Sequence, residues 1–126
     1  MIQTWNKLAW LLFLACVAHS SHAEAPLERT LRLDPTSANP RNSEGDFIKL
    51  RDGRILLVYT PFDGGAGDAA SSYLASRYSS DEGATWTEED VVVLPNEGKQ
   101  NTMSVSLLRL ADGRLAMFYL RKNSDQ

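Results

Sequence analysis

The sequence is poor in cysteine and histidine, and this scarcity excludes several kinds of site. It contains one cysteine, Cys16, and two histidines, His19 and His22, all near the N-terminus. Cleavage of an N-terminal targeting segment would remove all three. The rest of the chain then has no disulfide pair, no soft ligand for zinc or a similar metal, and no Ser-His-Asp triad. We therefore expect no disulfide framework, no metal centre and no cofactor.

Runs of positive charge and long apolar runs are also missing. Lysine and arginine number 13 against 16 acidic residues, which gives a net charge of −3. No basic stretch is long enough to neutralise a row of phosphates, so we expect no nucleic-acid partner. The apolar run at residues 8–18 is shorter than the roughly 20 residues that cross a bilayer. We therefore expect no stable membrane span in the mature chain.

Residues 1–23 have the pattern of a secretory signal peptide. Lys7 precedes the apolar run, and residues 21–23 place small side chains at the −3 and −1 positions of a cut before Glu24. This order of features predicts export to the periplasm or the extracellular space. Residues 13–16 loosely resemble a lipobox, so anchoring through Cys16 is a minor alternative. Phe13 weakens it, because leucine is usual at that position.

The remaining sequence divides into a leader and a β-rich part. Residues 24–46 are rich in proline, asparagine and serine without periodicity, which predicts an extended leader and loop. From Phe47 onward, short apolar runs alternate with turn signals, as in an all-β protein. Strands are expected at residues 47–50, 55–60, 73–78, 91–94, 103–110 and 115–120.

One segment of the β-rich part is repeated. Residues 50–59 recur as residues 110–119, with a constant offset of 60 and an Asp-Gly pair at the same place in each copy. Asp-Gly between apolar runs is a strong hairpin signal. A fixed period predicts a repeated sheet unit, and units of roughly 40–50 residues are typical of β-propeller blades.

A second motif, Ser-x-Asp-x-Gly-x-Thr-Trp, occupies residues 79–86. Ser79 and Asp81 can accept backbone N–H groups within a turn, and Gly83 permits a positive φ. Trp86 offers a large apolar face that can hold the hairpin on its sheet. The spacing, completed by Thr85, resembles the Asp box of sialidases and related β-propellers. We expect these five residues to be structural and to fix the register of the blade.

Together, the repeat and the Asp box make residues 40–126 similar to the first blade of the sialidase (BNR-repeat) family. The resemblance implies a six-bladed β-propeller, with one blade at residues 47–94 and the start of a second at 101–126. Strands 55–58 and 91–94 would then be sandwiched between blades. Because a propeller needs at least about four blades to close, we expect the chain to be the N-terminal part of a longer protein or a truncated product. The remaining blades would be needed for a closed fold.

The resemblance also assigns a catalytic role. In the family, an aspartate nine residues before the first arginine of the third strand acts as general acid/base. Asp68 stands nine residues before Arg77, in the glycine-rich loop 63–70. A carboxyl group there can protonate the leaving glycosidic oxygen or activate water. The structural alternative is that Asp68 only ends a turn, as we expect for Asp63 before Gly64.

The substrate-binding positions depart from the family pattern. Sialidases hold the substrate carboxylate with three arginines. In this sequence, the position that matches the first of these arginines falls on Ser43 or Glu44. Arg41 lies two to three residues earlier. Either an insertion lets Arg41 serve, or the arginine is absent. Glu44 and Asp46 would instead bind hydroxyl groups of a neutral glycan, supply a second carboxylate, or form a solvated turn. Asn101, which opens the inner strand of the second blade, would either face substrate or cap a loop.

These residues and motifs are compatible with three functions. The first is an exported exo-alpha-sialidase-like glycoside hydrolase that acts on glycans, with Asp68 as acid/base. Its tyrosine nucleophile, partner glutamate and other arginines would lie beyond Gln126, so the present chain alone would be inactive. The second is a non-catalytic Asp-box propeller that binds glycans or proteins. The third, weaker alternative is a structural adhesion repeat.

Overall fold

A computed structural model describes residues 28–124 of the chain, and it contains strands without any helix in that part. The expected signal peptide, residues 1–23, lies outside the described residues. The expectation of an all-β protein is confirmed. The strands are β1 (Arg41–Lys49), β2 (Ile55–Phe62), β3 (Leu74–Ser79), β4 (Val91–Leu94), β5 (Asn101–Arg109) and β6 (Leu115–Lys122).

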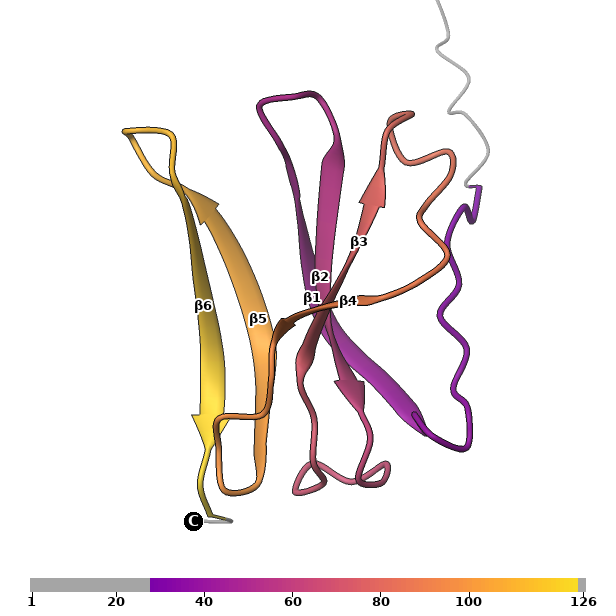
Figure 1. The fold of residues 1–126 in the computed structure, drawn as a ribbon, viewed down its shortest axis with the longest axis vertical. Coiled ribbons are helices and arrows are strands. Elements are labelled where there is room, and N and C mark those ends of the chain that lie inside the picture. The colour runs from indigo at the N-terminus through magenta and orange to yellow at the C-terminus, as the bar shows by residue number, and fades with distance from the viewer. Residues whose placement is uncertain (1–27, 125–126) are drawn as a thin grey trace, which may run out of the picture.

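The strands form two antiparallel sheets that stand side by side (Figure 1). The first has the order β1-β2-β3-β4, and the second is the hairpin β5-β6. Both sheets are open, and no closed sheet occurs between residues 28 and 124. Residues 41–94 form the first sheet as an antiparallel meander. The Asp-box segment connects β3 to β4, as predicted from its spacing.

The two Asp-Gly turns have the same structure. Gly53 and Gly113 have φ values of 91° and 84°, which glycine adopts without the steric cost of a Cβ atom. In each turn, an oxygen of Asp52 or Asp112 accepts the N–H of the following arginine, at 3.1 and 3.0 Å. The sequence repeat is therefore also a structural repeat.

The core lies between the two sheets. β5 packs against β1, β2 and β3, and the fully or almost fully buried side chains at the centre are Val58, Leu74 and Val105. Burial of one such side chain contributes about 1.5–3 kcal/mol. Four half-buried residues surround them: Leu56, Leu94, Leu107 and Met117.

One expectation about the strands was wrong. β1 begins at Arg41, within the expected leader, rather than at Phe47. Its polar first half pairs with the buried end of β2, where Arg41 stands opposite Phe62. Val91, Val92 and Val93 of the edge strand β4 are exposed, because no described element covers them; their expected packing between blades stays a prediction.

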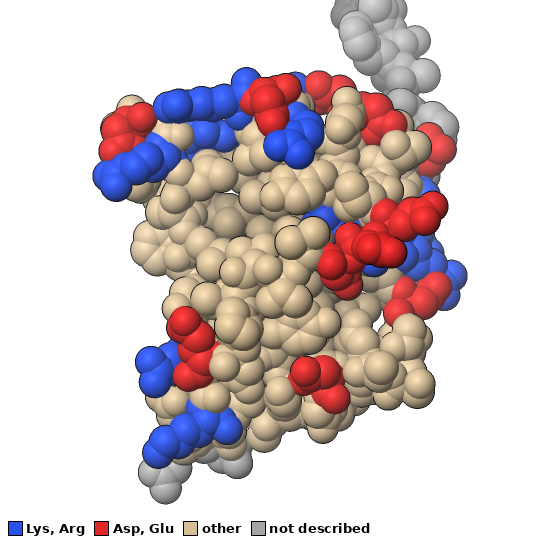
Figure 2. Space-filling model, in the orientation of Figure 1, with Lys and Arg blue, Asp and Glu red and all other residues tan. Residues whose placement is uncertain are grey.

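The segment before β1, residues 28–40, runs along the first sheet without forming a strand (Figure 1). The side-chain amide of Asn42 donates to the carbonyl of Leu33 at 3.0 Å and holds this segment in place. Charged side chains gather near the strand ends and along one flank, while uncharged residues occupy the middle of the face in Figure 2. No helix within residues 28–124 is long and apolar enough to cross a membrane.

Candidate functional site

The predicted acid and the predicted arginine meet at one end of the first sheet. The loop that carries Asp68 connects β2 to β3, and β1 begins at the same end (Figure 1). Arg41 donates from Nη1 to Oδ1 of Asp68 at 2.5 Å, although the residues are 27 positions apart. The same nitrogen donates to the carbonyl of Ala66 at 3.2 Å. One arginine thus contacts both a side chain and the backbone of the loop.

The Arg41 side chain also packs against the ring of Phe62. Its guanidinium lies 4.4 Å from the ring centroid of Phe62, a cation–π contact with a fully buried aromatic ring. Only 27 % of the Arg41 side chain is exposed, against 74 % for Asp68. The arginine is therefore the fixed partner of this pair, and the carboxylate is the accessible one.

Glu44 joins this group through Ser43. Nη2 of Arg41 donates to the hydroxyl of Ser43 at 3.0 Å, and that hydroxyl donates to Oε2 of Glu44 at 2.5 Å. Glu44 is the extra residue of a β-bulge, since Ser43 pairs with Thr60 and Gly45 with Tyr59. A bulge adds one residue to a strand and turns the chain locally.

The electrostatics of the pair favour an ionised Asp68. The hydrogen bond and positive charge of Arg41 lower the pKa of Asp68 below its ordinary value. Nζ of Lys122 also approaches this loop, at 3.3 Å from the carbonyl of Asp68. In this state the Asp68 carboxylate can accept a proton or a hydroxyl hydrogen bond.

Asn101 lies next to this group but does not face outward. It is fully buried, and its Nδ2 donates to the carbonyls of Asp68 and Ala70 at 2.8 and 3.0 Å. Its Oδ1 is buried without a hydrogen-bond partner among the described residues. Asn101 therefore fixes the Asp68 loop to the start of β5.

Asp46 lies apart from the group, between the sheets. Its Oδ2 accepts the N–H of Leu107 at 2.8 Å, and its Oδ1 accepts the N–H of Phe47. Both carboxylate oxygens are thus engaged by backbone donors. The structure brings Arg41, Glu44 and Asp68 together, with Asn101 behind them, but it does not bring Asp46 to that end.

The Asp box closes the opposite end of the sheet, because Ser79 at the end of β3 pairs with Ile55 at the start of β2. Asp81 accepts the N–H and the hydroxyl of Thr85 at 2.8 and 2.6 Å. Nε1 of Trp86 donates to the carbonyl of Gly83 at 3.0 Å. These contacts are internal to the turn.

A polar cluster that the sequence did not predict lies on the outer face of the sheet. The hydroxyl of Tyr59 donates to Asp90 at 2.7 Å, and Nε of Arg77 donates to the same carboxylate at 2.7 Å. Burial and the Asp90 carboxylate raise the pKa of Tyr59. Residues 28–40 border a cleft of about 270 Å³ beside this cluster. Tyr59 and Arg77 lie 31 and 13 residues before Asp90. No local motif in the sequence therefore predicts this cluster.

Comparisons with known proteins do not identify a family for this chain. It matches no protein-family model, and no curated protein matches it. Among the described residues, no three histidine, cysteine or acidic side chains are grouped in a way that could hold a metal ion. The class that the fold defines is an all-β protein with antiparallel sheets.

Proposed function

We propose that this chain is part of an exported, sialidase-like glycoside hydrolase of the β-propeller type. The observation that supports it most is the contact between Arg41 and Asp68. The sequence indicates these residues separately, one as a candidate carboxylate-binding arginine and the other as the acid/base. A sugar carboxylate and the Asp68 carboxylate would compete for the same guanidinium, and both suit its planar donors.

The competition suggests how Asp68 would become an acid. A substrate carboxylate that binds Arg41 would weaken its hydrogen bond to Asp68, which keeps the pKa of this group low in the free protein. The pKa of Asp68 would then rise, and the group could protonate the leaving glycosidic oxygen. Glu44, linked to Arg41 through Ser43, would contact substrate hydroxyl groups at the rim.

The test is hydrolysis of sialosides and of neutral glycosides by the protein in its longest encoded form. Asp68→Asn should reduce turnover by about 10²–10⁴-fold, the usual contribution of a general acid/base. Asp63→Asn is the matched control, because Asp63 lies in the same loop without the Arg41 contact. Turnover unchanged in Asp68→Asn would remove this residue from the mechanism.

A second candidate function is binding of glycans or proteins without catalysis. Its support is the ionised Asp68 and the neighbouring Glu44, since carboxylate oxygens accept hydrogen bonds from sugar hydroxyl groups. This function predicts that the wild-type protein binds a neutral glycan, measured by calorimetry, and hydrolyses none of the glycosides tested. Arg41→Met would then leave binding of neutral sugars largely intact.

A further inference from the structure

The second hairpin repeats the first, and it shows how such a hairpin packs. Leu107 and Met117 stand opposite each other in β5 and β6, and both pack against the core around Val58. Sixty residues earlier, Phe47 and Leu57 stand opposite each other in β1 and β2. The face of the first hairpin that carries Phe47 is therefore the counterpart of the face that β5 and β6 use to dock.

The other face of the second hairpin is open. The corresponding face of the first hairpin carries Val58. This residue is only 1 % exposed, because the second hairpin covers it. In the second hairpin the equivalent residue, Phe118, is 59 % exposed. We name this surface the receiving face; it consists of Leu108, Phe118 and Leu120, all exposed.

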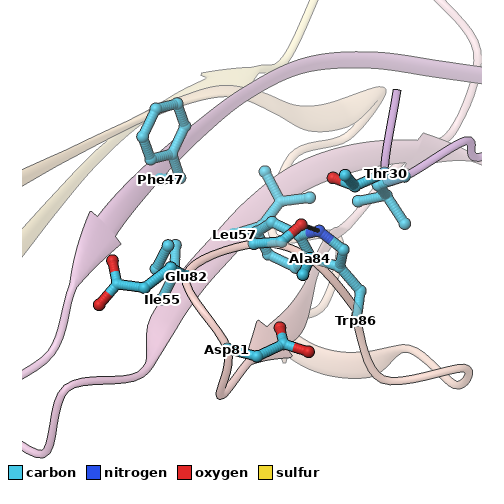
Figure 3. A pocket seen from close by; sticks show the side chains of 10 residues that line it. Thr30, Phe47, Ile55, Leu57, Asp81, Glu82, Ala84 and Trp86 are labelled. Atoms are coloured by element: carbon cyan, nitrogen blue, oxygen red, sulfur yellow. Dashed lines mark hydrogen bonds between the residues drawn. The ribbon is translucent and has the colours of Figure 1, made fainter. Parts of the chain in front are cut away.

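The outer face of the first sheet is open at the matching place. Phe47 is 69 % exposed, and a cleft of about 650 Å³ lies between it and Trp86 of the Asp-box turn. Figure 3 shows that Ile55 and Leu57 line this cleft from β2, while Thr30 borders it from the N-terminal segment. We name Phe47, Ile55 and Leu57 the docking face.

Polar groups at the edge of the existing interface have counterparts on these open faces. The guanidinium of Arg109 donates to the carbonyl of Lys49 across the two sheets. Lys49 occupies the position of Arg109 in the repeat, so the docking face also carries a cation at this edge. Lys49 now forms an exposed ion pair with Glu82. Exposed ion pairs are weak, so Lys49 can exchange this partner for a carbonyl of a second chain.

We propose that the docking face of one copy of this chain packs onto the receiving face of a second copy, in the way that β5 and β6 pack onto the first sheet. The observation that carries this is that the two open faces are the two halves of an interface already formed within the molecule. Such contacts are head-to-tail, so they join different surfaces and can continue beyond two copies. The inference concerns the 126-residue chain by itself and does not require the proposed enzymatic function; further blades of a longer protein would cover the same two faces.

The test uses two single variants of the full chain and measures mass by light scattering after size-exclusion chromatography. Phe47→Asp blocks the docking face, and Phe118→Asp blocks the receiving face. The wild type should grow beyond two chains with concentration, whereas each variant alone should remain a single chain. An equal mixture should form a species of two chains and no larger one, because one intact face remains on each partner.

Val91→Asp is the matched control, since Val91 is equally exposed but lies on the edge strand β4. It should associate like the wild type, and circular dichroism should show that all variants keep their β-sheet content. A wild type that stays a single chain would overturn the proposal, as would variants that associate as the wild type does. Variants that associate like the wild type would show that chains associate through another surface, for example through the apolar residues 8–18.

Cysteine cross-linking distinguishes the head-to-tail arrangement from a two-fold dimer. In a Cys16→Ser background, Leu57→Cys and Phe118→Cys should form a disulfide when mixed and not when each is alone. A two-fold dimer would instead join like residues, so cross-links within either single variant, without any between the two variants in the mixture, would contradict the proposal.

Discussion

Asn101 donates a hydrogen bond from Nδ2 to the backbone carbonyl of Asp68, at 2.8 Å, across 33 residues of sequence. A second bond from the same nitrogen reaches the carbonyl of Ala70. A single buried side chain of the second sheet thereby fixes the loop of the first sheet that carries the candidate acid. The two sheets depend on each other at this end for the position of Asp68.

Asn101→Ala should lower the free energy of unfolding by about 1–3 kcal/mol, because two carbonyls lose the hydrogen bonds that a fully buried side chain donates. Hydrogen exchange should accelerate at the amides of Asp63 and Ala70, which are bonded within this loop. Urea denaturation measures the first effect and NMR the second. Glu88→Ala, at an exposed position between β3 and β4, should change stability by no more than about 0.5 kcal/mol; equal losses in both variants would contradict this role for Asn101.

Much of the fold could be predicted from local signals. The Asp-Gly turns and the Asp box depend on residues within a few positions of each other, so their spacing indicates β-hairpins directly. The start of β1 could not be found in this way. Residues 41–46 are polar and contain a bulge, and they become a strand because Phe62 and Pro61 of β2 offer partners.

The candidate site could be predicted only in part, for the same reason. The family resemblance suggests Arg41 and Asp68 as separate candidates, but their contact depends on β1 pairing with β2. The buried position of Asn101 arises from packing between sheets, which no local pattern encodes. Tyr59, Arg77 and Asp90 come together from three parts of the chain, so no motif in the sequence predicts their cluster.

Leu74→Ala tests whether the core between the sheets holds the two units together. Leu74 is fully buried in the cluster with Val58 and Val105, so its truncation should cost about 2–5 kcal/mol. Leu108→Ala removes the same atoms from a residue that is 51 % exposed and should cost much less, because most of that surface is already hydrated. Urea denaturation of both variants, at a concentration where the chains do not associate, gives the comparison. Similar losses would show that the sheets do not share this core.

Arg41→Gln should raise the pKa of Asp68 toward the ordinary value of about 3.9, because the charge and hydrogen bond of Arg41 lower it in the wild type. NMR titration of the Asp68 carboxyl measures this shift. Arg54→Gln is a control, since Arg54 pairs with Asp52 at the opposite end of the sheet and should leave the Asp68 titration unchanged. An unaltered pKa of Asp68 in Arg41→Gln would mean that the ion pair is not formed in solution.

The Asp box should make stability depend on pH in the acid range. Hydrogen bonds from the hydroxyl and N–H of Thr85, and then from Ser79, lower the pKa of Asp81 to about 2. Because this value lies below the unfolded value of about 3.9, the stabilisation is complete above that pH and is lost as the pH falls toward 2. The melting temperature of the wild type should therefore decrease between these pH values. Asp81→Asn should melt at a lower temperature at neutral pH and show a smaller decrease on acidification. If the two proteins lost stability in parallel over this acid range, another carboxylate would be responsible.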